Sequence, residues 1–209
     1  EPRQTQFYVA FAVALASAMG IAFSANLFTL FIFYEMLTLS TYPLVAHHGD
    51  AKARNGARVY LLILLSTSIV FLIPAILWTL SLTGTLDFTP GGILAGKADA
   101  TTTAILLALF AFGVGKAAVM PVHKWLPIAM VAPTPVSALL HAVAVVKAGV
   151  FTILKVSVYI FGSDHLLATG ASDWLVYLAT FTLLAASVIA LTKDNLKARL
   201  AYSTVSQLG

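Results

Sequence analysis

Three charged residues stand deep within stretches of sequence that are otherwise apolar: Glu35, Lys116 and Lys147. Lys155 lies nearer the end of its stretch, from which its ammonium can reach the interface. A histidine, His141, lies in the same stretch as Lys147, one and a half helical turns before it. A carboxylate, an amine and an imidazole can each bind and release a proton, and burial in an apolar medium makes an uncompensated charge costly. These side chains in this setting predict a path for protons or small cations rather than a reaction on an organic substrate.

A static alternative is that Glu35 and one lysine form a buried ion pair that only holds two helices together. Each charge near the centre of a bilayer costs about 2.5–3.5 kcal/mol, so Glu35, Lys116 and Lys147 together cost roughly 9 kcal/mol. One carboxylate cannot neutralise two lysines, so some of these groups must be hydrated or must change protonation. The unequal set therefore favours proton or cation transfer over static pairing.

The elements that hold these residues are predicted to be membrane-spanning helices. The chain has 209 residues, of which 60% are hydrophobic and 10% are charged, whereas soluble domains have about 25% charged residues. A spanning helix needs about 20 mostly apolar residues, and no stretch alternates with the two-residue period of a barrel strand. The sequence predicts an all-α bundle of six spanning helices and the start of a seventh, at residues 7–23, 26–46, 59–82, 102–120, 135–161, 174–191 and 195–209.

The composition also excludes several classes of protein. A soluble chain of this length could not bury so much apolar surface, which excludes a soluble enzyme. The chain has no cysteine, which excludes a disulfide-stapled module, and its net charge of +4 forms no basic stripe for a nucleic acid. It contains no phosphate-binding loop, dinucleotide fingerprint, metal-spaced cluster or nucleophile elbow. We therefore expect no catalytic residue, no cofactor and no metal site.

The placement of the few charges predicts the orientation in the membrane. With alternating crossings, eight lysines and arginines fall on the side of loop 47–58, and Lys97 is the one on the opposite side. Positive residues concentrate in cytoplasmic loops, so loop 47–58 is expected to be cytoplasmic. The three tryptophans lie near the ends of predicted spans and are expected to be interfacial anchors: Trp78, Trp125 and Trp174.

A proline close to Lys116 predicts a broken helix. Pro121 lacks an amide hydrogen and would clash with the carbonyl of Ala117, so the fourth predicted helix should break near Pro121. Broken helices at membrane depth line cavities and mark ion sites in transporters. The alternative is that Pro121 ends a span and residues 122–131 form an interfacial helix. Two glycines directly before Lys116 favour the functional break.

Two polar residues follow this break, and another proline lies in the third predicted helix. His123 and Lys124 could take up or relay protons, or could simply lie at the membrane interface, and both roles stay open. Pro74 is expected to kink the third helix rather than end it.

Four segments carry a resemblance to a known family. Residues 113–127 read GVGKAAVMPVHKWLP, and residues 132–142 read APTPVSALLHA. Residues 33–39 (FYEMLTL) and 193–208 (KDNLKARLAYSTVSQL) fit the same pattern. The chain resembles the antiporter-like membrane subunits shared by Mrp-type monovalent cation/proton antiporters and NADH:quinone oxidoreductase, or complex I.

The resemblance implies an inverted-repeat transporter whose five-helix repeats each contain one broken helix. Residues 1–209 would form a single transmembrane ion-translocating domain, an internal segment of a longer subunit. The first repeat would cover 7–161, and the second would begin at 173–209. Carried over by position, Glu35 would modulate the proton affinity of Lys116. Lys147 would hand protons toward the bilayer centre, with His141 as a relay beside it.

The function that the resemblance implies is proton translocation by a multisubunit cation/proton antiporter in a bacterial inner membrane. Residues 35–44 and 145–151 are nearer to the antiporter branch. The alternative is a proton-pumping subunit of NADH:quinone oxidoreductase, where the chain would belong to an enzyme without carrying a redox centre. A purely structural subunit and a receptor bundle with a lysine-bound chromophore are less favoured. Expected partners are other membrane subunits, the lipid bilayer and protons, and no residue selects sodium over protons.

Overall fold

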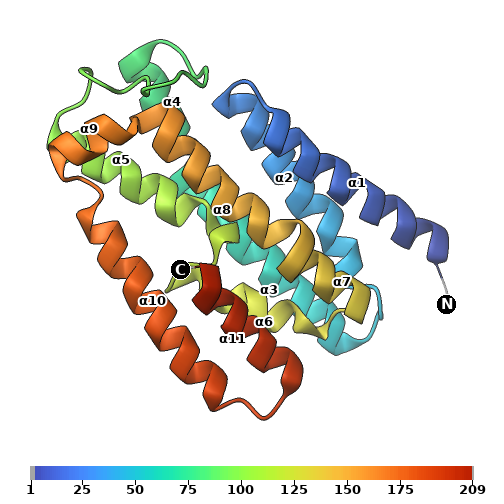
Figure 1. Cartoon of the computed structure of the whole chain (residues 1–209). Coiled ribbons are helices and arrows are strands. Elements are labelled where there is room, and N and C mark those ends of the chain that lie inside the picture. The colour runs from blue at the N-terminus through green and yellow to red at the C-terminus, as the bar shows by residue number, and fades with distance from the viewer. Residues whose placement is uncertain (1–2, 209) are drawn as a thin grey trace.

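The computed structural model describes residues 3–208, and this part of the chain is helical, with one isolated β-bridge between Asn26 and Asp87 (Figure 1). The α-helices are α1 (Gln4–Phe23), α2 (Leu27–Val45), α3 (Ala51–Thr67), α4 (Ile73–Thr83), α5 (Ala100–Gly113), α6 (Trp125–Ile128), α7 (Thr134–Ala138), α8 (Val145–Val156), α9 (Ser163–Thr169), α10 (Asp173–Leu191) and α11 (Leu196–Leu208). Short 3₁₀ or π-helical segments lie between them: η1 (Ser68–Leu72), η2 (Gly115–Ala117), η3 (Val122–Lys124), η4 (Ala129–Val131), η5 (Leu139–Val143) and η6 (Ser157–Phe161). The predicted all-α class is confirmed.

Five helical stretches of the described residues are long and apolar enough to cross a membrane. They are Gln4–Phe23, Leu27–Val45, Ala51–Thr83, Thr134–Phe161 and Asp173–Leu191. Helix α5 is also apolar but has only 14 residues. Its length of about 21 Å is shorter than the roughly 30 Å of a bilayer core. The chain must therefore complete this crossing with the irregular segment that follows α5.

The third stretch is one continuous helix that begins earlier than predicted. Asp50 caps α3 by accepting a hydrogen bond from the amide of Ala53 at 2.6 Å, so residues 51–58 are helical and not part of a loop. The 33 residues from Ala51 to Thr83 would extend about 50 Å, which is more than a bilayer core. Pro74 lies two residues after the π-helical turn η1, and the helix continues past it. The prediction that Pro74 does not end the helix is confirmed.

The fourth predicted helix ends earlier than residue 120. Asp99 caps α5, and hydrogen bonds from Thr102 hold the pKa of the Asp99 carboxyl below its usual value. Helix α5 ends at Gly113, the chain leaves helical geometry at Val114 (φ −82°, ψ 63°), and Ala118 is left-handed with φ 57°. The predicted break is confirmed, but it begins at Val114 and extends through the region of Pro121. Because the helix has already ended, a clash between Pro121 and an upstream carbonyl is not its cause.

Helix α8 runs through the middle of the bundle and packs against α1, α2, α5 and η2 (Figure 1). Helices α1 and α2 form a hairpin on one side, and α10 and α11 form a second hairpin on the other. Helices α1 and α10 expose large apolar side chains, among them Tyr8, Phe23, Tyr177 and Leu191. The bundle therefore buries its polar groups inside and presents an apolar exterior, as a membrane requires.

Candidate functional site

Lys116 is fully buried and is held by helix α2. It lies in η2, directly after α5 ends. Its Nζ atom donates hydrogen bonds to the Tyr34 carbonyl oxygen at 2.9 Å and to Thr38 Oγ1 at 2.5 Å. The same Nζ atom lies 3.2 Å from the centroid of the Tyr34 ring. An ammonium group inside the bundle is thus surrounded by a carbonyl, a hydroxyl and an aromatic face.

Glycines allow the broken segment to approach the neighbouring helices closely. A Cβ atom at Gly115 would lie 2.5 Å from Thr67 Oγ1 of α3. A Cβ atom at Gly149 of α8 would overlap the backbone of Ala117 and Lys116. Side chains at these positions would push the segment away from α3 and α8. The Lys116 turn therefore depends on small residues both within it and across from it.

A buried tryptophan fixes the other side of the break. The Nε1 atom of Trp125 donates a hydrogen bond to the Gly115 carbonyl oxygen at 2.9 Å, and its ring packs edge-on against Tyr60 at 5.5 Å between centroids. The Tyr60 hydroxyl lies 2.6 Å from Thr41 Oγ1. Trp125 is fully buried, so its prediction as an interfacial anchor is wrong. It stabilises the broken segment by adding a second hydrogen bond to the Gly115 carbonyl oxygen, which also accepts from the Ala118 amide at 3.1 Å.

Residues 122–131 also pack against the bundle, through side chains that are buried in it. They form the short segments η3, α6 and η4, which contact α3 and α11. The side chains of Leu126 and Ala129 are fully buried, like that of Trp125. The alternative of a plain interfacial helix after Pro121 is therefore wrong. The segment closes the broken crossing from within the bundle.

Glu35 does not form the ion pair that the static alternative requires. It lies in the middle of α2, next to Tyr34, and both of its carboxylate oxygens are buried. Neither oxygen has a hydrogen-bond partner among residues 3–208. Lys116 is bound instead by Tyr34 and Thr38. A direct Glu35–Lys116 salt bridge is thus absent from the described residues, although Lys116 contacts α2 at Tyr34, the residue before Glu35.

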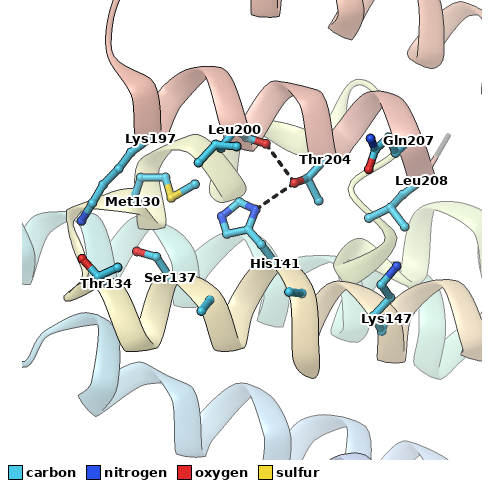
Figure 2. A pocket seen from close by; sticks show the side chains of 12 residues that line it. Met130, Thr134, Ser137, His141, Lys147, Lys197, Leu200, Thr204, Gln207 and Leu208 are labelled. Atoms are coloured by element: carbon cyan, nitrogen blue, oxygen red, sulfur yellow. Dashed lines mark hydrogen bonds between the residues drawn. The ribbon is translucent and has the colours of Figure 1, made fainter.

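His141 and Lys147 line a second site, next to α11. The helix that carries them is interrupted: η5 has the wider π-helical winding, and Ala144 departs from helical geometry with φ −121°. The Nδ1 atom of His141 lies 3.3 Å from Thr204 Oγ1 of α11 (Figure 2). Its Nε2 atom is buried without a partner among residues 3–208. Such π-helical turns often occur at functional sites.

These two residues open on a cavity of about 510 Å³ between the η5–α8 helix and α11. Figure 2 shows His141 and Lys147 directed from one wall toward Thr204 and Gln207 on the other. Lys197 of α11 lies at one end of this cavity and donates a hydrogen bond to the Ala132 carbonyl oxygen at 3.0 Å. Lys147 is exposed to the cavity and therefore has room to change its contacts.

His123 and Lys124 point in different directions. The His123 side chain is buried, its ring lies 5.9 Å from the ring of Tyr202 in α11, and its Nδ1 atom has no partner among the described residues. Lys124 is exposed, as is Pro121. The structure therefore brings the predicted residues together as two groups, Glu35 with Lys116 and His141 with Lys147. His123 lies apart from both, against α11.

Several polar residues of the site were not predicted. Tyr34 and Thr38 bind Lys116, and Thr204 meets His141. Tyr34 and Thr38 are four residues apart, which places them on one face of a helix. Their helical spacing beside Glu35 is the sequence pattern from which they could have been predicted. Thr204 and Gly149 give no such local signal, because their importance arises from contacts with distant segments.

Comparison with known proteins places this arrangement in a family. Residues 24–209 match the family described as NADH:quinone oxidoreductase/Mrp antiporter, TM. The chain belongs to this family. It is 33% identical to NAD(P)H-quinone oxidoreductase chain 5 of Synechocystis sp., over 100% of this chain and 31% of that relative. It is 35% identical to an antiporter subunit, mnhA2, of Staphylococcus aureus, over 98% of this chain and 25% of that relative.

Solved structures of membrane complexes share the fold. The Mrp complex from Dietzia sp. matches with a TM-score of 0.83 and 31% identity, over 97% of this chain and 22% of that chain. The membrane-bound sulfane sulfur reductase, an archaeal respiratory membrane complex, matches with a TM-score of 0.82 and 28% identity, over 97% of this chain and 41% of that chain. The chain thus spans about a third or less of the curated relatives and is similar to subunits of multisubunit membrane complexes.

Proposed function

We propose that this chain carries protons across a membrane as part of a subunit of a multisubunit monovalent cation/proton antiporter. The observation that carries this proposal is Lys116, a fully buried amine in a broken crossing that forms no ion pair with a carboxylate of residues 3–208. A lysine ammonium is a compact charge on a flexible stem, and buried lysines exchange protons readily. The Staphylococcus aureus antiporter subunit and the Dietzia Mrp complex support the same function.

In this proposal the proton is transferred by four residues: Glu35, Lys116, His141 and Lys147. His123 and Lys124 take up the proton or relay it to them. Lys116 and Lys147 belong to segments in direct contact, because η2 packs on α8 at Gly149. The unpaired Nε2 atom of His141 can accept or donate a proton beside the cavity that Lys147 lines. The proton would pass from the Glu35 and Lys116 group to the His141 and Lys147 group across this contact.

We further propose that residues 7–161 form a first five-helix repeat and that 173–209 begin a second one. The cavity between η5–α8 and α11 would then lie at the junction of the two repeats. This position favours a route for the proton from one repeat into the next. Other membrane subunits would complete the complex in a bacterial inner membrane.

The second candidate is a proton-pumping membrane subunit of an NADH:quinone oxidoreductase. The similarity to the Synechocystis oxidoreductase chain favours it. The two candidates predict different driving forces for the same buried path. Proton flux that depends on a sodium gradient supports the antiporter, and flux that depends on electron donation to a quinone supports the oxidoreductase.

The proposed path is tested by Lys147→Ala in the full-length complex reconstituted into lipid vesicles. Proton flux is expected to fall about 100-fold, since proton transfer by a positioned group contributes 10²–10⁴-fold. A pH-sensitive dye inside the vesicles measures the flux. Lys97→Ala is the matched control, because Lys97 is exposed and donates one hydrogen bond, to the Thr83 carbonyl oxygen. Equal flux in the Lys147 and Lys97 variants would contradict the proposed path.

The proposed orientation is tested by cysteine labelling, because the sequence contains no cysteine. Lys52 lies at the start of the long Ala51–Thr83 helix, and Lys97 lies in the loop that follows the end of this helix. Both lysines are exposed. In intact cells a membrane-impermeant maleimide is expected to label Lys97→Cys and to leave Lys52→Cys unlabelled. After permeabilisation both should react. Labelling of Lys52→Cys in intact cells would reverse the orientation.

A further inference from the structure

The contacts of the Lys116 ammonium match its hydrogen-bonding capacity. An ammonium group has three N–H donors and no acceptor. The Tyr34 carbonyl oxygen takes one donor, Thr38 Oγ1 takes a second, and the face of the Tyr34 ring lies beneath the nitrogen. Aromatic faces attract cations, most strongly where water is excluded. The three partners therefore satisfy a charged lysine without a carboxylate.

Thr38 is oriented to accept from Lys116. Its hydroxyl lies 3.2 Å from the Tyr34 carbonyl oxygen, to which it donates its own hydrogen. With that hydrogen engaged, the oxygen lone pairs face the Lys116 Nζ atom. A neutral amine has one fewer hydrogen and a lone pair, so it would lose one of these three contacts. The arrangement therefore discriminates between the two protonation states.

Tyr34 holds the main chain of the broken segment as well as the ammonium. Its hydroxyl accepts a hydrogen bond from the Lys116 amide at 3.2 Å. The side chain of Tyr34 is fully buried, so its position is set by packing within the bundle. One residue of α2 thus fixes both ends of Lys116, the backbone through its hydroxyl and the ammonium through its carbonyl and ring.

Other titratable groups around Lys116 have other partners or face elsewhere. The titratable or charged residues on the packed elements are Tyr34, Glu35 and Tyr42 on α2, Lys52, Arg54, Arg58 and Tyr60 on α3, His123 and Lys124 on η3, and Lys147 and Lys155 on α8. Lys52, Arg54 and Arg58 are exposed, and Tyr42 is half-buried near the end of α2. Tyr60 pairs with Thr41, Lys155 donates to the Ser24 carbonyl oxygen, and Lys147 faces the cavity. Lys124 is exposed, and His123 packs on Tyr202. Glu35 is the neighbouring negative charge, and its carboxylate oxygens have no hydrogen-bond partner among residues 3–208.

We propose that Tyr34 and Thr38 are positioning residues that form a seat for the protonated form of Lys116. The proposal rests on the proposed function, since it assigns the state in which Lys116 holds its proton. Release of the proton removes one contact of the seat and frees the side chain to turn toward α8. The seat thereby sets the pH at which Lys116 gives up its proton.

The test is the pH profile of proton flux in the full-length complex in vesicles, comparing wild type with Thr38→Val. Valine keeps the shape of threonine and removes the acceptor. Because a hydrogen bond to a charged group is lost, the alkaline limb of the profile is expected to move to lower pH by about one to two units. Thr38→Ser restores the hydroxyl and should restore the wild-type profile. If valine prevents assembly, Thr38→Cys supplies the same test, because a thiol is a weaker acceptor.

The control is Thr79→Val, because Thr79 is equally buried and bonds only to the carbonyl of its own helix at Ala75. It should leave the pH profile unchanged. A Thr38→Val profile identical to wild type would overturn the seat, and so would a serine variant that fails to rescue. Lys116→Ala, measured in parallel, separates this from the proposed function. If proton flux survives in Lys116→Ala, the proposed function is refuted. If Lys116→Ala abolishes the flux but Thr38→Val keeps the wild-type pH profile, only the seat is refuted.

Discussion

Replacing Lys116 by alanine is expected to reduce proton flux through the full-length complex about 1,000-fold, because the chain loses the proton-binding group of the broken crossing. The variant should still assemble, since the change also removes a buried charge that is costly to place in a membrane. The Tyr34 carbonyl and the Thr38 hydroxyl remain paired with each other. Flux in vesicles and the amount of assembled complex are the two measurements.

Lys116→Arg tests whether transport needs only the positive charge of Lys116 or also the release of its proton. Arginine keeps the positive charge but does not release its proton in proteins. If Lys116 only attracts charge or stabilises helix packing, the arginine variant should keep a substantial part of the flux. If Lys116 exchanges its proton, Lys116→Arg should be as inactive as Lys116→Ala. Substantial flux in Lys116→Arg would therefore contradict proton exchange at this residue.

Gly149→Ala is expected to reduce both the stability of the fold and the proton flux. The added Cβ atom would overlap the backbone of Ala117 and Lys116, and neither can rotate away as a side chain could. Overpacking of this kind destabilises a fold by about 1–3 kcal/mol. It would also displace the Lys116 turn from its seat on α2, and a 1 Å misplacement of a reacting group can cost about 100-fold in rate. We expect both a lower unfolding temperature and a loss of flux of this order.

Gly20→Ala is the matched control for this prediction. Gly20 lies in α1, far along the chain from the break, and its added Cβ atom would meet the half-buried side chain of Phe33. A side chain can move aside where a backbone cannot, so flux should remain near the wild-type level. If Gly149→Ala transports as well as Gly20→Ala, the close packing of η2 on α8 is not required for transport.

These predictions distinguish two lysines whose different surroundings the sequence alone does not reveal. Lys116 faces α2 and is enclosed, whereas Lys147 faces a cavity toward α11 and is exposed to it. The contact at Gly149 lies between them. An enclosed lysine with fixed partners and a mobile lysine in a cavity are suited to different steps, the first to holding a proton and the second to passing it on.

The sequence by itself determined the fold class and the ionisable residues. Long apolar stretches can only become helices in a bilayer, because no water is present to pair the backbone. The same scarcity of charge made Glu35, Lys116 and Lys147 conspicuous. Pro74 was correctly predicted not to end its helix.

Tertiary structure decided where the helix breaks and what each ionisable group contacts. The break begins at Val114 because Gly113 and Gly115 let the chain pack against η1 and α3, and no local rule for proline contains that contact. Lys116 binds Tyr34 and Thr38 rather than Glu35, because the direction in which α2 faces the broken segment depends on the packing of the whole bundle. Local propensity and charge cost can be evaluated from neighbours in the chain. The partners of a buried side chain are residues far away in sequence, so only the folded bundle determines them.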